Sequence, residues 1–363
     1  MLKLPAMRVV SGLLIMTMSS SGWTQGVITM PRTPSPAATV TQTVGISSIS
    51  INYSRPSVKG REVWGTLVPY GWNKQNFGNG NEAPWRAGAN ENTTIKLSHD
   101  AKIEGHSVPA GTYGLFFVIN KDNSGEVILS KDSKAWGSFW YNPAQDKLRE
   151  KISVREIPHT EMLTYDFINL TKNSADLVLN WEKKQFPVKI EFAVDDIVMA
   201  NATEELTNTI GFGWQGYASA ANYALQNQVN YDQALKWIER AITQNNSFAT
   251  LNTKAGILKA MGKTADADKI TADAVVIATE NELNTYGYQL LTAKQEGKAI
   301  DMFILNTQRH PKSPNVWDSL GEGYALKGDK KNAIINFKKS LGLNPPAAVK
   351  ANSEKYLKQL GEK

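Results

Sequence analysis

One short segment of the chain concentrates side chains that could bind a ligand or do chemistry. The segment WRAGANENTT places Trp85, Arg86, Asn90 and Glu91 close together in the chain. A guanidinium group presents a planar set of donors that matches a carboxylate or a phosphate, and amide and carboxylate groups bond the hydroxyls of polar ligands. The same residues also suit a tight turn, because Gly88 and Asn90 tolerate turn backbone and Arg86 could pair with Glu91. Both the binding and the structural interpretation stay open.

A second polar segment, RPSVKGR, surrounds a Pro-Gly turn with basic side chains. It runs from Arg55 to Arg61 and contains three cations. Such a turn can cradle an anion, but basic side chains also cover apolar surface with their alkyl stems while the charged heads stay in water. A cleft in which Arg55, Arg61 and Arg86 converge would favour the anion cradle.

A third segment, KAWGSFWYNP, is rich in aromatic residues and is expected to form a loop. Exposed aromatic side chains bind sugar rings and peptides, but buried anchors of a loop have the same composition. The candidate ligand-binding residues of the three segments are Arg55, Arg61, Arg86, Asn90, Glu91, Trp136 and Trp140.

The sequence contains no motif of a known catalytic, metal or cofactor site. The four histidines, His99, His106, His159 and His310, lack the spacing of zinc ligands. There is no G-x-S-x-G elbow, no P-loop and no dinucleotide-binding fingerprint. We therefore predict no metal, no cofactor and no catalytic residue. An alternative remains, a hydrolase or carbohydrate-active enzyme that uses Glu91 or His106 as acid or base.

Composition and charge exclude several classes of protein. A length of 363 residues predicts two domains. The net charge of +6 is spread along the chain, unlike the concentrated basic patch of a nucleic-acid-binding protein. The absence of cysteine excludes disulfides, thiolate catalysis, cysteine-ligated zinc and a lipoprotein anchor on cysteine.

The amino-terminal residues predict export from the cytoplasm. Lys3 and Arg8 precede an apolar run from Val9 to Met18, and small residues follow. This pattern is typical of a secretory signal peptide and is too short for a membrane span. We expect residues 1–24 to be removed. The mature chain is then expected to be a soluble periplasmic or secreted protein without a membrane-spanning segment.

Residues 37–194 have the hydrophobic period of β-strands. Apolar residues alternate in segments such as SISINYS and TTIKLS, and Gly, Asn, Asp and Pro stand between the segments. About eight or nine short strands of this kind predict an antiparallel β-sandwich or jelly-roll-like domain. Within it, NWEKKQFPV predicts a hairpin with Glu182, Lys183 and Lys184 at its tip.

After Asp195 the hydrophobic period becomes helical and matches tetratricopeptide repeats. The segment from Ser313 to Pro345 fits that pattern, in which small residues let two helices approach closely. Corresponding alanines follow one another at spacings of 33, 32 and 34 residues. The anchors of the repeats are expected to be Ala234, Gly262, Ala267, Ala299, Trp317, Gly321, Tyr324, Ala333 and Pro345. We expect a linker helix at 195–210, an α-helical solenoid of about four repeats at 211–347 and a capping helix at 348–363.

Four segments of the β half resemble a bacterial family known only as a domain of unknown function, number 2911. They are YSRPSVKGREVWGTLVPYG, WRAGANENTTI, IEGHSVPAGTYGLF and LVLNWEKKQFPVKIE, and together they cover most of residues 37–194. The resemblance implies the same β domain, and some members of the family carry a helical-repeat tail like this one. It implies no activity, because the family has no established one.

These patterns together predict a cell-envelope protein that binds other molecules. The β domain is expected to bind a small polar or carbohydrate ligand. The concave groove of the repeats is expected to bind a protein or a peptide. A cavity in which a carboxylate or a histidine meets Arg86 or Arg55 would instead favour the enzyme.

Overall fold

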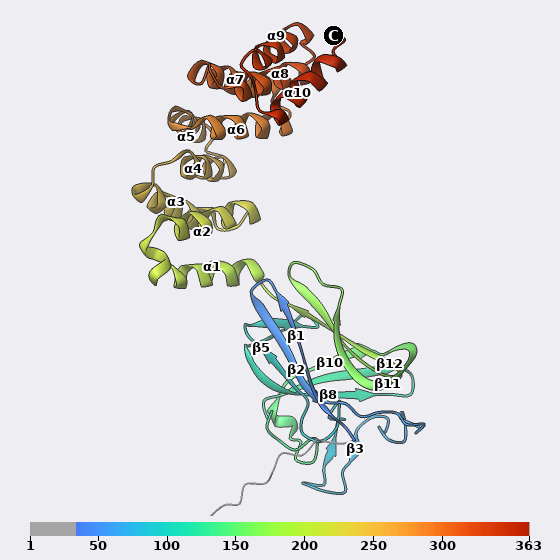
Figure 1. Ribbon diagram of the computed structural model, residues 1–363. Coiled ribbons are helices and arrows are strands. Elements are labelled where there is room, and N and C mark those ends of the chain that lie inside the picture. Colours follow the sequence, from blue (N-terminus) through green and yellow to red (C-terminus); the bar gives the residue numbers. More distant parts are fainter. Residues whose placement is uncertain (1–33, 363) are drawn as a thin grey trace, which may run out of the picture. The chain divides into compact units, whose positions relative to one another are not determined.

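The computed structural model describes residues 34–362, so the predicted signal peptide lies outside the described residues. The chain divides into two compact units, one built from strands and one mainly from helices (Figure 1). The helical unit contains residues 191–363 together with the short segments 43–47 and 170–174.

The strands form two larger sheets and one small ribbon. The six-stranded sheet has the order β1 (Ala37–Val44), β2 (Ser47–Ser54), β5 (Thr94–Leu97), β8 (Gly111–Ile119), β9 (Ser124–Ser130) and β10 (Asp146–Ser153). The four-stranded sheet has the order β11 (Arg155–Ile168), β12 (Ser174–Glu191), β6 (Ala101–Ile103) and β7 (His106–Val108). The ribbon pairs β3 (Asn73–Lys74) with β4 (Glu82–Ala83). The strand pairs with a defined register run antiparallel, as predicted.

The core of the β unit lies between the two larger sheets. Alternate residues of β2 are buried, among them Ile49 and Ile51, as the period of two predicts. Tyr53 of β2 contacts Tyr165 of β11 with ring centroids 4.7 Å apart. Phe117 of β8 contacts the phenyl ring of Phe186 in β12 at 5.2 Å. These contacts between sheets confirm the predicted sandwich.

The hairpin predicted at Glu182–Lys184 is wrong. The chain runs through this segment as one strand, β12, of 18 residues. Glu182 takes a left-handed backbone with φ 53°, and the register with β11 shifts opposite it, at Thr160. A bulge of this kind bends a strand without reversing it and lets polar residues stand inside a strand. The polar EKK cluster therefore marks a bend rather than a turn.

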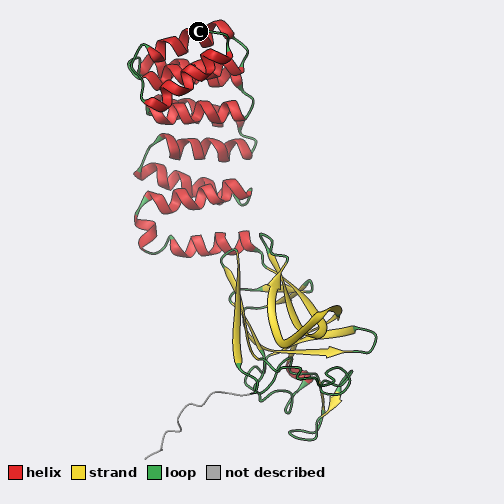
Figure 2. Ribbon diagram, turned by 45° about the vertical axis from the view of Figure 1, so that its right-hand side comes forward, coloured by secondary structure: helices red, strands yellow, loops and turns green. Residues whose placement is uncertain are grey.

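The helices form antiparallel pairs that follow one another along the chain (Figure 2). A first helix, α1, spans Val194–Glu205, and a last helix, α10, spans Ala347–Gln359. The pairs between them are α2 (Trp214–Asn227) with α3 (Tyr231–Gln244), α4 (Phe248–Ala260) with α5 (Thr264–Ile277), α6 (Glu280–Thr292) with α7 (Glu296–Arg309), and α8 (Pro314–Leu326) with α9 (Lys330–Leu341). This arrangement confirms the predicted solenoid of helical repeats.

The predicted small anchors lie where paired helices touch. Ala234, Ala299 and Ala333 have no exposed surface, and Ala267 is 4% exposed. A Cβ atom on Gly321 would lie 2.8 Å from the ring of Phe337 on the paired helix. Larger side chains at these positions would separate the helices.

The remaining anchors occupy the turn between α4 and α5, helix α8 and the connection before α10. Gly262 has φ 77°, a left-handed conformation that glycine adopts without strain. Trp317 donates from Nε1 to the carbonyl oxygen of Pro311 at 2.9 Å. Tyr324 packs against the cluster formed by α9 and α10. Pro345 lies in the connection before α10.

Within residues 34–362, no helix has the length and apolar character that a membrane crossing requires.

Candidate functional site

A cavity of about 580 Å³ in the β unit is lined by residues of both polar segments. Lys59 and Arg61 come from RPSVKGR, and Arg86 and Asn90 come from WRAGANENTT. The other polar side chains at the wall are Ser35, Ser57, Asn73, Gln75 and Ser138, with the indoles of Trp85 and Trp181. The two segments, separate in the sequence, therefore share one site.

Arg86 is held at this cavity by contacts on several sides. Its Nη1 donates to the carbonyl oxygen of Asn90 at 2.6 Å. The guanidinium carbon lies 4.9 Å from the centroid of the Phe139 ring, a cation–π geometry. A Cβ atom on Gly137 would lie 2.3 Å from the same carbon, so only glycine leaves room for the guanidinium. Burial lowers the pKa of Arg86 from its ordinary value.

The WRAGANENTT segment is also a closed structural loop. The carbonyl oxygen of Ala87 accepts hydrogen bonds from the buried hydroxyl of Tyr165 at 2.9 Å and from Oγ1 of Thr93 at 3.1 Å. Ala87 and Asn90 both have left-handed backbone, with φ 53° and 62°. Asn90 donates from Nδ2 to the carbonyl oxygen of Ser35 at 3.2 Å. The segment thus combines the structural and the site interpretation, because one fixed loop presents Arg86 to the cavity.

A cluster of tryptophans forms the apolar side of the site. The rings of Trp85 and Trp181 stack, with centroids 5.8 Å apart and 17° between planes. The ring of Trp64 meets both edge-on, at 5.7 Å from Trp85 and 5.9 Å from Trp181. Nε1 of Trp64 donates to Oε2 of Glu182 at 3.2 Å. Trp181 is 1% exposed, and its buried Nε1 has no hydrogen-bond partner among the described residues.

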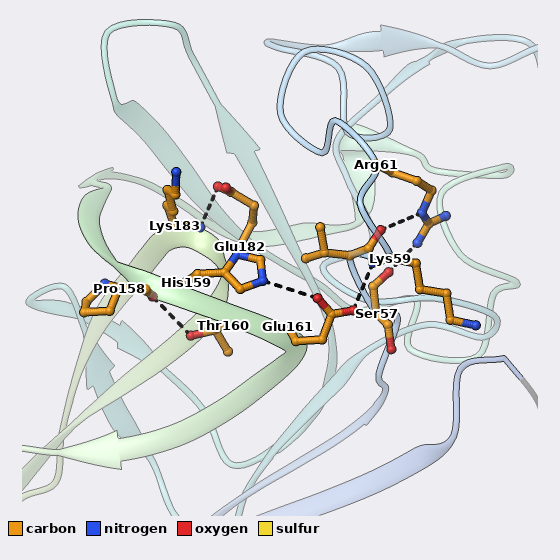
Figure 3. Close-up of polar contacts among 10 residues, drawn as sticks. Ser57, Lys59, Arg61, Pro158, His159, Thr160, Glu161, Glu182 and Lys183 are labelled. Carbon is orange, nitrogen blue, oxygen red and sulfur yellow. Dashed lines mark hydrogen bonds and ion pairs between the residues drawn. The ribbon is translucent and has the colours of Figure 1, made fainter.

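The RPSVKGR turn contributes Lys59 and Arg61 to the lining of the same cavity. Arg61 donates from Nε to the carbonyl oxygen of Val58 at 3.0 Å and from Nη2 to that of Ser57. The backbone N–H of Lys59 donates to Oε1 of Glu161 at 2.9 Å. These bonds fix the turn and leave the Lys59 ammonium group to extend away from it (Figure 3).

His159 and Glu161 support this turn from β11. Oε2 of Glu161 lies 3.2 Å from Nε2 of His159. The backbone N–H of Lys59, followed by the imidazole of His159, lowers the pKa of the Glu161 carboxyl. Both side chains are exposed, and neither lines the cavity.

Arg55 points away from the cavity. Its Nε donates to the carbonyl oxygen of Leu163 at 3.0 Å, and its Nη2 donates to Oγ1 of Thr164 at 2.7 Å. Arg55 therefore links the end of β2 to β11. The structure brings Arg61 and Arg86 together at one wall, but it does not bring Arg55 there.

The aromatic loop lies beside the cavity but contributes only one lining side chain. Ser138 lines the wall and donates to the carbonyl oxygen of Pro84 at 2.7 Å. Trp136 and Trp140 are 49% and 48% exposed and do not line it. Trp140 contacts the ring of Phe77 at 5.7 Å. The two predicted tryptophans lie on the surface of the β unit.

The acid–base groups of the enzyme alternative lie elsewhere. Among the described residues that line the cavity there is no carboxylate and no histidine. His106 lies at β7, with Nδ1 3.0 Å from Oε1 of Glu150. Glu91 follows Asn90 in the loop without reaching the cavity wall. Residues 34–362 also contain no group of three or more potential metal ligands.

Several lining residues were not predicted from the sequence. Trp181 lies in a strand whose alternating pattern indicates only core. Asn73 and Gln75 lie at the β3–β4 ribbon, which has no hydrophobic period that would mark it as part of a site. Lys59 lies in RPSVKGR between Arg55 and Arg61, which were both predicted as binding residues. This position was the signal that could have identified Lys59.

The helical unit has a larger cavity of about 680 Å³. Its wall is formed by apolar side chains such as Leu225, Val275 and Met302, with charged residues of both signs, among them Lys259 and Asp301. The lining residues come from α2, α4, α5, α6 and α7 and the turn after α6. A mixed wall of this kind suits a peptide better than a single charged group.

Comparison with known proteins identifies the β unit by family but not by activity. Residues 35–190 match the family described as a protein of unknown function, DUF2911, which confirms the resemblance stated from four sequence segments. No curated protein matches the chain.

Solved structures similar to part of the chain include YrrB, MamA and the pilF protein. YrrB, described as a TPR protein with an unusual peptide-binding site, is 16% identical with a TM-score of 0.28, and the match covers 44% of this chain and 84% of that chain. MamA is 14% identical with a TM-score of 0.28, covering 42% and 89%. The pilF protein of Pseudomonas aeruginosa is 21% identical with a TM-score of 0.28, covering 42% and 71%.

Proposed function

We propose that the chain is an exported cell-envelope protein with two binding modules and no catalytic role. The β unit binds a small polar ligand in its cavity, and the helical repeats bind a protein or a peptide. The proposed division is a signal peptide at 1–24, the β domain at 37–194, a linker helix at 195–210, the repeats at 211–347 and a capping helix at 348–363.

The convergence of two separate polar segments on one cavity carries this proposal. A cavity of about 580 Å³ lies within the usual range for small-molecule sites, about 300–1,000 Å³. Its polar groups sit on a loop closed by Ala87 and Thr93 and on a turn closed by Val58 and Arg61. Groups held in this way bind a ligand at low entropic cost.

The cavity of the helical unit supports the second module. Its wall joins successive helix pairs and combines apolar with charged residues. Helical repeats present extended surfaces of this kind to partner proteins. An extended segment with apolar side chains at intervals and charges between them fits this wall.

The export proposal is supported by the order of residues near the amino terminus. A basic start, an apolar run of ten residues and small residues follow one another in the first 24 positions. The lack of cysteine means that the proposed exported chain is stabilised by its cores without disulfides.

A thermal-shift screen of the full mature chain tests the ligand-binding module. The panel contains neutral sugars, amines, carboxylates and phosphates. We expect at least one compound to raise the melting temperature, because a ligand that binds only the folded state stabilises it. The variant Ala89→Phe fills the cavity wall and should abolish the shift.

Ala144→Phe is the matched control, because Ala144 is exposed and does not line the cavity. A panel in which no class of compound shifts the wild-type melting temperature contradicts the proposed module. Equal shifts in wild type and Ala89→Phe would place the ligand at another site.

A further inference from the structure

We infer that the ligand of the β-unit cavity carries an anionic group, a carboxylate or a phosphate, and this inference rests on the proposed ligand-binding function. The charge of the wall, the donor chemistry of its side chains and the fixed position of one guanidinium point to it independently.

The charge of the cavity wall is strongly one-sided. Lys59, Arg61 and Arg86 line it, and no aspartate, glutamate or histidine does so among the described residues. Charges of one sign in a concave, low-dielectric wall reinforce one another and attract ions of the opposite sign. The chain as a whole is nearly balanced, with 40 basic and 34 acidic residues. The local excess is therefore a property of this cavity.

The charged and indole side chains at the wall offer only donors. Arginine, lysine and the tryptophan N–H have no acceptor atom. Ser138 and Gln75 each donate one hydrogen bond within the protein, to the carbonyl oxygens of Pro84 and Asn73, and keep their acceptor atoms. A ligand that matches the charged side chains must supply acceptors, and carboxylate and phosphate oxygens are the strongest acceptors for these donors.

Arg86 is pre-positioned to meet such a group. Its hydrogen bond to the carbonyl oxygen of Asn90 uses one of five N–H donors. Phe139 and Gly137 fix the plane of the guanidinium from the side. The remaining donors form the fork that binds a carboxylate or a phosphate through two parallel hydrogen bonds.

Lys59 and Arg61 supply the other positive charges of the cavity wall. Arg61 is held in its turn by the carbonyl oxygens of Val58 and Ser57. Lys59 is held through its backbone by Glu161. Glu161 is exposed, lies 3.2 Å from His159 and stands outside the cavity wall.

Titration calorimetry on the full mature chain tests the inference. The probes are inorganic phosphate and pyrophosphate in one arm and succinate and citrate in the other, with glucose and spermidine as neutral and cationic controls. The two arms decide between phosphate and carboxylate. We expect binding in one arm, with affinity that falls as sodium chloride is raised, because salt screens the wall charges.

Two variants locate the anion at the cavity. Arg86→Gln should weaken binding at least about tenfold, which corresponds to about 1.4 kcal/mol. Lys59→Gln changes an exposed side chain, is expected to fold normally, and should weaken binding as well. Lys74→Gln is the matched control: Lys74 is an exposed cation between two lining residues but does not line the cavity, so binding should be unchanged.

Binding of a neutral or cationic probe that Ala89→Phe abolishes would overturn the anion inference while the proposed module stands. The inference also fails if no anion binds, or if Arg86→Gln and Lys59→Gln bind the anion as tightly as wild type. Failure of every class of compound in the thermal-shift screen would overturn the module itself.

Discussion

The same substitution, glycine to alanine, should have opposite effects at two positions only ten residues apart in the helical unit. Gly287 lies inside α6, where an added Cβ atom would stand 2.3, 2.7 and 2.8 Å from three ring atoms of Phe303. Gly297 lies in the first turn of α7, where an added Cβ atom meets no atom within 4 Å. Gly287→Ala should destabilise the repeats, and Gly297→Ala should stabilise them.

The magnitudes follow from packing and helix propensity. Alanine is favoured over glycine in a helix by about 1 kcal/mol, and near a helix end by less. The Phe303 ring cannot retreat from Gly287, because it is fully buried, touches Tyr288 at 5.2 Å and has Gly323 on another side. An overpacking cost of about 3 kcal/mol, the upper end of the usual range, exceeds the propensity gain. The net destabilisation is then about 2 kcal/mol.

Thermal unfolding followed by circular dichroism at the helix band measures both variants in the full chain. This signal reports mainly the helical unit, which keeps the β unit from dominating the transition. Gly287→Ala should lower the melting temperature by about 4–8 °C and Gly297→Ala should raise it slightly. Shifts of both variants in the same direction would refute the packing of α6 against α7 described above.

Three further outcomes test other parts of the molecule. Arg55→Ala should lower the stability of the β unit by about 1–3 kcal/mol, because the carbonyl oxygen of Leu163 loses its charged donor, and calorimetric anion binding should not change. Lys294→Gly should raise the melting temperature of the helical unit. Lys294 has a left-handed φ of 57°, which costs a residue with a side chain about 1 kcal/mol. A lower melting temperature of the variant would contradict this reasoning. Burial raises the pKa of the Asp318 carboxyl above its ordinary value of 3.8, although Ser353 and Asn352 oppose the shift. The raised pKa therefore stabilises the folded state fully at pH values below 3.8. This stabilisation is lost as the pH rises through the raised pKa. Between about pH 4 and about pH 7, the melting temperature of Asp318→Asn should rise relative to that of wild type. A difference in melting temperature that stays constant over this range would argue against the raised pKa of Asp318.

Local patterns in the sequence predicted most of the fold. Alternation of apolar residues is visible within a few positions and gave strands such as β2 and β5, because every second side chain of a strand points to the core. The spacing of Ala234, Ala267, Ala299 and Ala333 gave the repeats, because each helix pair needs a small residue at the same point of contact. The predicted hairpin at Glu182 failed, because a bulge and a turn have the same polar composition.

The candidate site was predicted by segment but not by side chain. RPSVKGR and WRAGANENTT do meet at one cavity. Neither segment shows which of its basic residues faces that cavity. Arg55 bonds Leu163, which is 108 positions away in the chain, so the direction of this side chain depends on a partner that no local pattern contains.

The sequence by itself determined the two hydrophobic periods, the repeat spacing and the clustering of basic and aromatic residues, since each depends on neighbours in the chain. Only the tertiary structure decided that Arg86 and Arg61 share a wall with Trp181 while Arg55 does not. The physical reason is that side-chain direction is set by backbone conformation and long-range contact. The left-handed φ of 62° at Asn90 turns its loop, and the stacking of Trp85 on Trp181 joins a loop to a strand far away in the chain.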